Sequence, residues 1–197
     1  MESIKSFGGI IYEEFIPKID SEIVTKSDIK KIHNWLKDIF GEKIQYELIY
    51  RATTHGDSNS IIFQRCKNIP NLLWIMKDRD NNIFGCFHSI PIKINEKYCI
   101  PIKSNDMYSK DLKCFLFSLN KNKKYSPNPK VENILFHNSS HVIEFGCNNN
   151  FEFCIGNQFL SINSVYFSDG PIFNHKNELS GNKKALSLLD LEIFKLF

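Results

Sequence analysis

The fold class is decided by a stretch that reads Leu72-Leu73-Trp74-Ile75-Met76-Lys77, then Asp78-Arg79-Asp80-Asn81, and then Asn82 to Ile90. Its two flanks are rich in β-branched, aromatic and other apolar side chains, which suit the half-buried surface of a pleated sheet. The four residues between the flanks are polar and suit a hairpin turn. The stretch therefore predicts two antiparallel strands joined by a short connection.

Further short apolar segments lie on both sides of this hairpin, separated by turns. Many short strands separated by turns favour an antiparallel sandwich over parallel βαβ units. We expect strands at residues 46–50, 98–102, 114–119, 134–137, 142–146, 151–155 and 159–165. The apolar residues Leu188, Leu191, Ile193 and Phe194 mark the segment that ends the chain, and polar loops are expected at residues 120–130 and 169–181.

One long helix is predicted near the N-terminus. Thr25 and Asp28 have the spacing of a capping box, and apolar residues then recur at helical intervals as far as Phe40, before Gly41. This pattern indicates a helix over residues 27–40 that packs one apolar face. After the turn His55-Gly56-Asp57-Ser58, Asp57 or Ser58 is expected to cap a second short helix that runs to Cys66. The predicted class is α+β, mostly β: a two-sheet antiparallel sandwich with a few short helices at its margins.

Length and composition restrict the class of protein. The 197 residues make one domain, which we place at residues 26–197 behind an N-terminal arm of residues 1–25. A net charge of +3 is too small to indicate a dedicated nucleic-acid domain, and the 42% hydrophobic content fits a globular protein. No apolar run approaches the roughly 20 residues of a membrane span, and the first 20 residues lack the features of a signal peptide. We therefore expect a cytoplasmic protein without a membrane span.

The six cysteines at 66, 86, 99, 114, 147 and 154 form no CxxC pair and no Cys/His ligand pattern. Reduced, buried thiols are the ordinary state of such cysteines in a cytosolic protein. The alternative is a redox-sensing thiol, which requires an exposed cysteine of low pKa.

Familiar catalytic motifs are absent from the sequence, including phosphate-binding glycine loops, the zinc-protease helix and the nucleophile elbow. His137 and His141 are four residues apart but lie in turn composition without a third ligand, so we expect no metal. Cys66, His55 and Asp57 could form a nucleophile, a base and an orienting acid, but nothing in the sequence brings them together. The sequence thus favours a protein that is not an enzyme and has no cofactor.

Six lysines lie between Lys110 and Lys130, with Phe115, Phe117 and Tyr125 interleaved. A basic patch with stacking aromatic rings would bind nucleic acid. The more ordinary interpretation is that the two Phe rings alternate into the core while the lysines face solvent. The patch candidates are Lys121, Lys123 and Lys124.

Five motifs, in order, resemble those of TLDc domains over roughly residues 27–197. The first is Leu48 to Ser58, which runs without a gap to Cys66, and the second is the Leu72 to Phe87 hairpin. Phe115-Leu116-Phe117-Ser118-Leu119 is similar to a third family motif. The last two are Phe145-Gly146 with Phe151 to Ile155, and Leu188 to Phe194. Departures from the family pattern occur at His55, where the family has Asp, at Cys86, and at Cys147-Asn148, where it has glycines.

The resemblance implies a two-sheet sandwich with short helices and a function in binding rather than catalysis. TLDc proteins are associated with protection from oxidative damage and with the vacuolar proton-pumping ATPase. The implied partner is therefore a protein, with the peripheral subunits of that pump as the leading candidate. A nucleic-acid-binding stress regulator that uses residues 110–130 and a thiol-based redox sensor are the alternatives.

The candidate structural or partner-binding residues from these motifs are Gly56, Ser58, Gly85, Gly146 and Glu192. The three glycines are expected where the backbone needs a positive φ or a close approach. Glu192 lies between apolar neighbours on an alternating strand, so its side chain points away from those of Leu191 and Ile193. A buried carboxylate needs hydrogen-bond partners, and Glu192 either anchors a loop or marks a partner surface. We favour the anchor.

Overall fold

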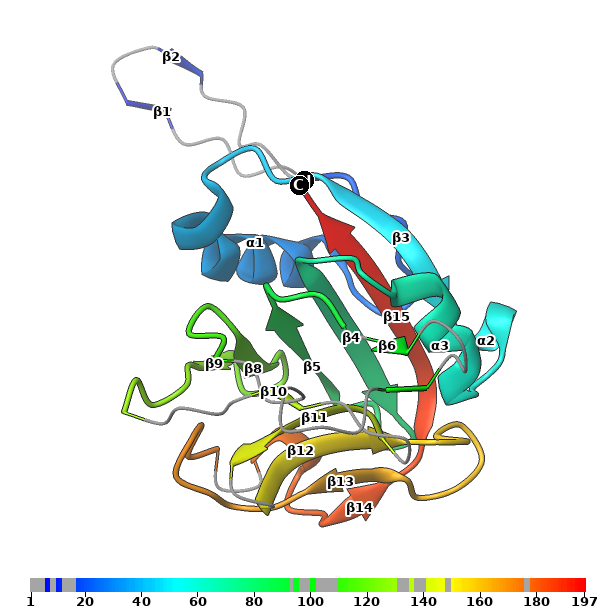
Figure 1. The fold of residues 1–197 in the computed structure, drawn as a ribbon. Coiled ribbons are helices and arrows are strands. Elements are labelled where there is room, and N and C mark those ends of the chain that lie inside the picture. Colours follow the sequence, from blue (N-terminus) through cyan, green and yellow to red (C-terminus); the bar gives the residue numbers. More distant parts are fainter. Residues whose placement is uncertain are drawn as a thin grey trace.

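Two antiparallel β-sheets lie face to face, and one helix packs on the outer face of the larger sheet (Figure 1). The computed structural model describes residues 6–7, 10–11, 17–92, 94–95, 100–101, 110–130, 135–136, 141–147, 150–175 and 178–197. The larger sheet has six strands in the order β3-β15-β4-β5-β8-β9, and the smaller has five in the order β10-β11-β12-β13-β14. The predicted class, a mostly β two-sheet sandwich with short helices, is confirmed.

The helices are α1 (Lys26–Phe40), α2 (Ala52–His55), α3 (Asn59–Cys66) and the 3-10 turn η2 (Glu178–Ser180). The larger sheet is built from β3 (Tyr46–Arg51), β4 (Leu72–Asp78), β5 (Ile83–His88), β8 (Phe115–Ser118), β9 (Lys123–Tyr125) and β15 (Leu188–Leu196). The smaller sheet is built from β10 (Leu135–Phe136), β11 (His141–Cys147), β12 (Asn150–Gly156), β13 (Val165–Phe167) and β14 (Ala185–Leu186). The pairs β1 (Ser6–Phe7) with β2 (Ile10–Ile11) and β6 (Ile94–Asn95) with β7 (Ile100–Pro101) form two small antiparallel ribbons.

Strand β4 is apolar from Leu72 to Met76 because both of its faces are covered there. Leu72, Trp74 and Met76 contribute to the core between the two sheets. Leu73 and Ile75 point to the other face, where they pack in a second core under α1. Alternate side chains of a strand lie on opposite faces, so burial on both faces removes the polar half of the usual pattern.

The predicted hairpin is present as β4 and β5, which pair from Leu72–His88 to Lys77–Ile83. Asp78 is 1% exposed, and its Oδ1 accepts the amides of Asp80 at 2.9 Å and Asn82 at 2.8 Å. Asn81 has a φ of +63°, a conformation that Asn tolerates better than most residues. The polar turn residues therefore close the hairpin through their own side chains.

Helix α1 begins with the capping box expected from the sequence. The Thr25 hydroxyl accepts the amide of Asp28, and the Asp28 carboxylate accepts the amide of Thr25. Ile29, Ile32 and Leu36 are buried on one face of the helix, and Ile32 and Leu36 reach the second core beneath it. The helix ends at Gly41, whose φ is +80°.

Two segment predictions were wrong. Residues 159–164 form turns rather than a strand, because Gln158 adopts a φ of +56° and its carbonyl accepts the amides of Ser161 and Ile162. Strand pairing begins only at Val165. The expected loop at 120–130 contains strand β9, which pairs with β8 from Leu116–Tyr125 to Ser118–Lys123.

Candidate functional site: a buried carboxylate that holds the N-terminal segment

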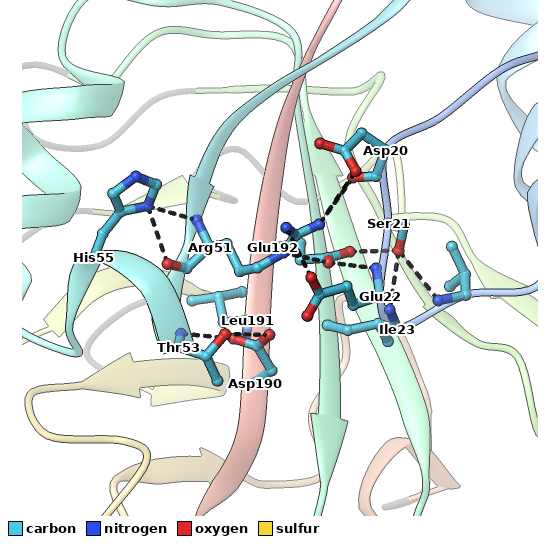
Figure 2. Close-up of polar contacts among 11 residues, drawn as sticks. Asp20, Ser21, Glu22, Ile23, Arg51, Thr53, His55, Asp190, Leu191 and Glu192 are labelled. Atoms are coloured by element: carbon cyan, nitrogen blue, oxygen red, sulfur yellow. Dashed lines mark hydrogen bonds and ion pairs between the residues drawn. The ribbon is translucent and has the colours of Figure 1, made fainter.

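Glu192 lies in the middle of β15 and is fully buried, yet its carboxylate is well supplied with donors. Oε2 accepts the Ser21 hydroxyl at 2.5 Å, and Oε1 accepts the Glu22 amide at 2.8 Å. Oε1 also accepts Nε of Arg51 at 2.9 Å, from the neighbouring strand β3. Figure 2 shows these three donors converging on one carboxylate. The buried charge is therefore both paired and hydrogen-bonded, as burial requires.

Arg51 is the second member of the site and connects the sheet to the same N-terminal segment. Its Nη2 donates to the Asp20 carbonyl at 3.1 Å, and its Nη1 lies 3.2 Å from the Glu22 carboxylate. Burial disfavours the charged guanidinium, but the hydrogen bond to Glu192 and the nearby acidic charges outweigh it and raise the pKa of Arg51. The planar guanidinium uses several N–H groups at once, which a lysine ammonium could not do in this geometry.

The segment held by these two side chains is residues 20–24, which we name the strap. Ser21 closes a local turn as well, because its Oγ accepts the amides of Ile23 and Val24 at 3.1 Å. Ile23 is 7% exposed and packs in the core under α1, with Val24 partly buried beside it. The strap is thus fixed by one apolar anchor and by the polar contacts of Arg51 and Glu192.

Asp190 lies two residues before Glu192, and its carboxylate holds the start of α2 against β15. Its Oδ1 accepts the amide of Thr53, and its Oδ2 accepts the Thr53 hydroxyl, both at 3.0 Å. Nδ1 of His55, at the end of α2, lies 3.0 Å from both the amide nitrogen and the carbonyl oxygen of Arg51. The residues that follow β3 are therefore tied back to β15 and to β3 itself (Figure 2).

The candidates Gly56 and Ser58 shape the loop between α2 and α3. Gly56 has a φ of +89°, which favours glycine, and its carbonyl accepts the Tyr50 hydroxyl at 2.5 Å. Ser58 is the N-cap of α3 and accepts the amide of Ile61. Asp57 reaches across to the turn at 158–162, where its carboxylate accepts the amide of Leu160 at 3.2 Å.

The other two candidate glycines lie inside sheets. A Cβ at Gly85 would lie 2.5 Å from Cζ of Phe117 and closer still to the carbonyl oxygen of Trp74, so the backbone approach there excludes any side chain. Gly146 is buried at a register shift between β11 and β12, where Phe145 pairs with Phe153 but Gly146 pairs with Phe151. The close packing at Gly85 requires a glycine, whereas Gly146 is shown only to lie at the register shift; a role in partner binding for the five candidates stays a prediction.

The basic segment does not present the features of a nucleic-acid site. Phe115 is 1% exposed and Phe117 is fully buried, so neither ring is available to stack on a base. Lys123 pairs with Glu178 at 2.8 Å. Lys124 donates to the Trp35 carbonyl at 3.2 Å and lies over the Phe115 ring. Lys121 is exposed, and its backbone amide bonds to Ser118.

The four cysteines whose surroundings the structure describes are Cys66, Cys86, Cys114 and Cys154, all free and buried. Burial raises the pKa of Cys66 to about 12 and also raises the pKa of the other three thiols. A thiol that stays protonated is a poor nucleophile, so these four do not favour a redox sensor. Cys99 and the side chain of Cys147 lie outside the described residues.

The structure does not bring the imagined catalytic and metal sets together. His55 Nδ1 faces the Arg51 backbone and Asp57 bonds the turn at 158–162, while Cys66 is a buried thiol of raised pKa. His141 lies 3.2 Å from the Glu144 carboxylate, and His137 lies outside the described residues. Within the described ranges, no group of three or more His, Cys, Asp or Glu side chains is placed to hold a metal ion.

Sequence reasoning singled out Glu192 but not its partners. Arg51 is a charged residue that directly follows the apolar run Leu48-Ile49-Tyr50 at the end of β3, and this is the one local signal that could have marked it. Nothing local marks the contact of Ser21 with Glu192 or that of Asp190 with Thr53, because these contacts are made with residues 171 and 137 positions away.

Comparison with known protein families identifies the family to which this fold belongs. The family model for the TLDc domain matches residues 18–197, so it includes the strap as well as the two sheets. TLDc domains are linked to resistance to oxidative stress. A comparison with curated protein sequences found no match, and none of the described helices is long and apolar enough to cross a bilayer. The match covers nearly all of the chain, and the chain therefore belongs to the TLDc domain family.

Proposed function

We propose that this chain is a non-catalytic, protein-binding TLDc domain that acts in the cytoplasm in oxidative-stress resistance by regulating the vacuolar proton-pumping ATPase. The observation that carries the proposal is the family match over residues 18–197, combined with the tasks of the buried polar groups. Asp78, Asp111, Asp190, Glu152 and Glu192 each accept backbone amides.

A catalytic site needs titratable groups that converge on a space where a substrate fits. The buried carboxylates described above instead converge on segments of the chain itself, and their lone pairs are occupied by amide and hydroxyl donors. Such carboxylates stabilise the fold, which supports the proposal that the domain presents a surface to a partner protein. The boundary of the domain at residue 26 stays a prediction, because the family match begins at residue 18 and the strap packs on the sheet.

The test is binding to the purified peripheral sector of the proton pump. We expect the chain to co-elute with that sector in size-exclusion chromatography and to change its rate of ATP hydrolysis. The matched control is the chain after thermal unfolding, which should do neither. Independent elution at micromolar concentrations of both components, together with an unchanged hydrolysis rate, would rule the pump out as the partner.

Cells supply a second readout for the stress role. Deleting the chain should lower survival after peroxide treatment, and the unaltered chain should restore it. The variants Cys66→Ser and Cys154→Ser should restore survival equally well, since the proposed role does not use these thiols. If survival is the same with and without the chain, the stress role is wrong.

A further inference from the structure

The strap occupies its place on β3 and β15 in the way that a bound peptide would. Five groups of the strap contact the two side chains beneath it. The Ser21 hydroxyl and the Glu22 amide donate to Glu192, while the Asp20 carbonyl and the carboxylates of Asp20 and Glu22 face Arg51 (Figure 2). Two of these five groups belong to the backbone, so another segment with suitable side chains and the same bend could supply the same set.

The strap has few means of holding itself in place. Residues 17–25 form neither helix nor strand, and the side chains of Asp20 and Glu22 are 80% and 70% exposed. Ile23 is its one deeply buried side chain. Segments with few buried contacts and no regular hydrogen-bond ladder open more readily than the elements they cover.

The surface beneath the strap cannot easily stay uncovered. Glu192 is fully buried, and two of the three donors that the described part of the chain gives it come from the strap. Of these three, Arg51 alone would remain after the strap is removed, and an under-satisfied buried charge is costly. Opening is therefore favoured only when another segment brings a hydroxyl and an amide to the same oxygens.

We infer that the strap is a displaceable cover over a peptide-binding surface formed by Arg51 and Glu192. The ligand that fits is a segment of a partner protein that bends as the strap does, in which a Ser or Thr precedes an acidic residue and an apolar residue follows. The hydroxyl and the next amide bond Glu192, the acidic side chain pairs with Arg51, and the apolar side chain replaces Ile23. This inference rests on the proposed function in protein binding.

Competition by the strap sets the affinity of this surface. A tethered segment has a high effective concentration, so a free peptide binds only in the fraction of molecules in which the strap is open. Weakening the strap without changing Arg51 or Glu192 should therefore increase the affinity for a free peptide. A surface that served only to fix the N-terminal segment would show no such increase.

The test uses a fluorescent peptide with the sequence of residues 17–25, titrated with the full chain and followed by fluorescence anisotropy. The double variant Ser21→Ala/Ile23→Ala should bind it at least tenfold more tightly than the unaltered chain. Adding Arg51→Ala to that double variant, or replacing the serine of the peptide by alanine, should lower the affinity at least tenfold. Equal affinities across all these combinations would overturn the inference.

A measurement on the unaltered chain keeps the inference testable if the double variant folds poorly. Hydrogen exchange reports the amide of Glu22, which is protected by its bond to Glu192. Saturating peptide should accelerate exchange at Glu22 while the amides of β4 stay protected. Peptide binding that leaves the exchange of Glu22 unchanged would show that the peptide binds elsewhere and would overturn the inference.

Failure of this inference is distinguishable from failure of the proposed function. If the pump sector binds the unaltered chain but the peptide binds no variant, the displaceable strap is wrong and the partner stands. If the peptide displaces the strap but the pump sector never binds, the surface stands and the pump is the wrong partner.

Discussion

Glu192 and Glu152 are both buried carboxylates that hold a loop against a sheet, but they obtain their donors in different ways. Glu192 is served by a hydroxyl, an amide and the guanidinium of Arg51, from segments 171 and 141 positions away. Glu152, on β12, is 2% exposed and accepts the amides of Ile172 at 2.6 Å and Phe173 at 2.8 Å. Among the described residues, Glu152 thus relies on the backbone of a loop only about 20 residues away.

The difference indicates which loop can be exchanged. Glu152 is bonded by two consecutive backbone amides, those of Ile172 and Phe173, whose positions are fixed by the path of their loop. Another segment could therefore not easily replace this loop. The strap gives Glu192 one hydroxyl and one amide, while the cation Arg51 stays on β3, so another segment with a hydroxyl and a free amide can match it. Glu192 is therefore the better place for a regulated contact, and Glu152 for a permanent one.

The largest effect should come from removing the charge at the exchangeable site. Glu192→Ala leaves the Arg51 guanidinium without its closest carboxylate and frees the strap, which should destabilise the fold by about 3–5 kcal/mol. Chemical denaturation followed by tryptophan fluorescence measures this loss. Glu47→Ala, on the exposed side of β3, is the matched control and should stay within about 0.5 kcal/mol. A loss at Glu192 no larger than that of the control would contradict the comparison.

The pH dependence of stability distinguishes the buried carboxylates from a buried histidine, His88, which is fully buried in β5. His88 Nε2 accepts the Trp74 indole N–H at 3.0 Å, and Nδ1 then donates to the Ile90 carbonyl at 2.7 Å. Burial lowers the pKa of His88 from 6.5 to about 4, so the folded protein holds the ring neutral. The unfolded chain binds the proton first, and stability that is complete above pH 6.5 should fall by about 1.4 kcal/mol per pH unit down to pH 4.

Denaturation midpoints measured from pH 7.5 to pH 4 provide the test. Ordinary carboxylates titrate near pH 4, so a loss that begins close to pH 6.5 reports a histidine. His88→Gln keeps a donor and an acceptor but does not titrate, so its loss of stability between pH 6.5 and 5 should be smaller than that of the unaltered chain, with the remaining loss contributed by His33, whose pKa burial also lowers. If the unaltered chain loses no more stability than this variant over that interval, the neutral buried His88 is wrong.

The smallest effect concerns the permanent site. A Cβ at Gly170 would lie 2.5 Å from Cδ of Glu152 and closer still to Oε1. Gly170→Ala should therefore cost about 1–3 kcal/mol through overpacking against a carboxylate that cannot move away from its amides. In a Glu152→Ala background the obstructing atoms are gone, so the same change should cost less than about 0.5 kcal/mol. Thermal unfolding of the unaltered chain, the two single variants and the double variant gives the four stabilities of this double-mutant cycle. If the two single losses of stability simply add up in the double variant, the contact between Gly170 and Glu152 is wrong.

Local features of the fold could be predicted well from the sequence. The capping box at Thr25 and Asp28, the N-cap at Ser58 and the positive φ of Gly56 depend on residues within a few positions of one another. The failed strand at 159–164 shows the limit, because the apolar pattern was compatible with a strand. The Asp57 carboxylate, about a hundred positions away, instead bonds Leu160 within that turn.

The sequence by itself determined the alternation of apolar side chains, the turns and caps between strands, and hence a mostly β sandwich of the TLDc family. Only the tertiary structure decided that Glu192 meets Ser21 and Arg51, and that Glu152 meets the loop at 172–173. The physical reason is range: caps and strand periodicity act over neighbouring residues, and any short window of sequence displays them. Partners of a buried charge are brought together by the packing of the whole chain, which leaves no local pattern to read.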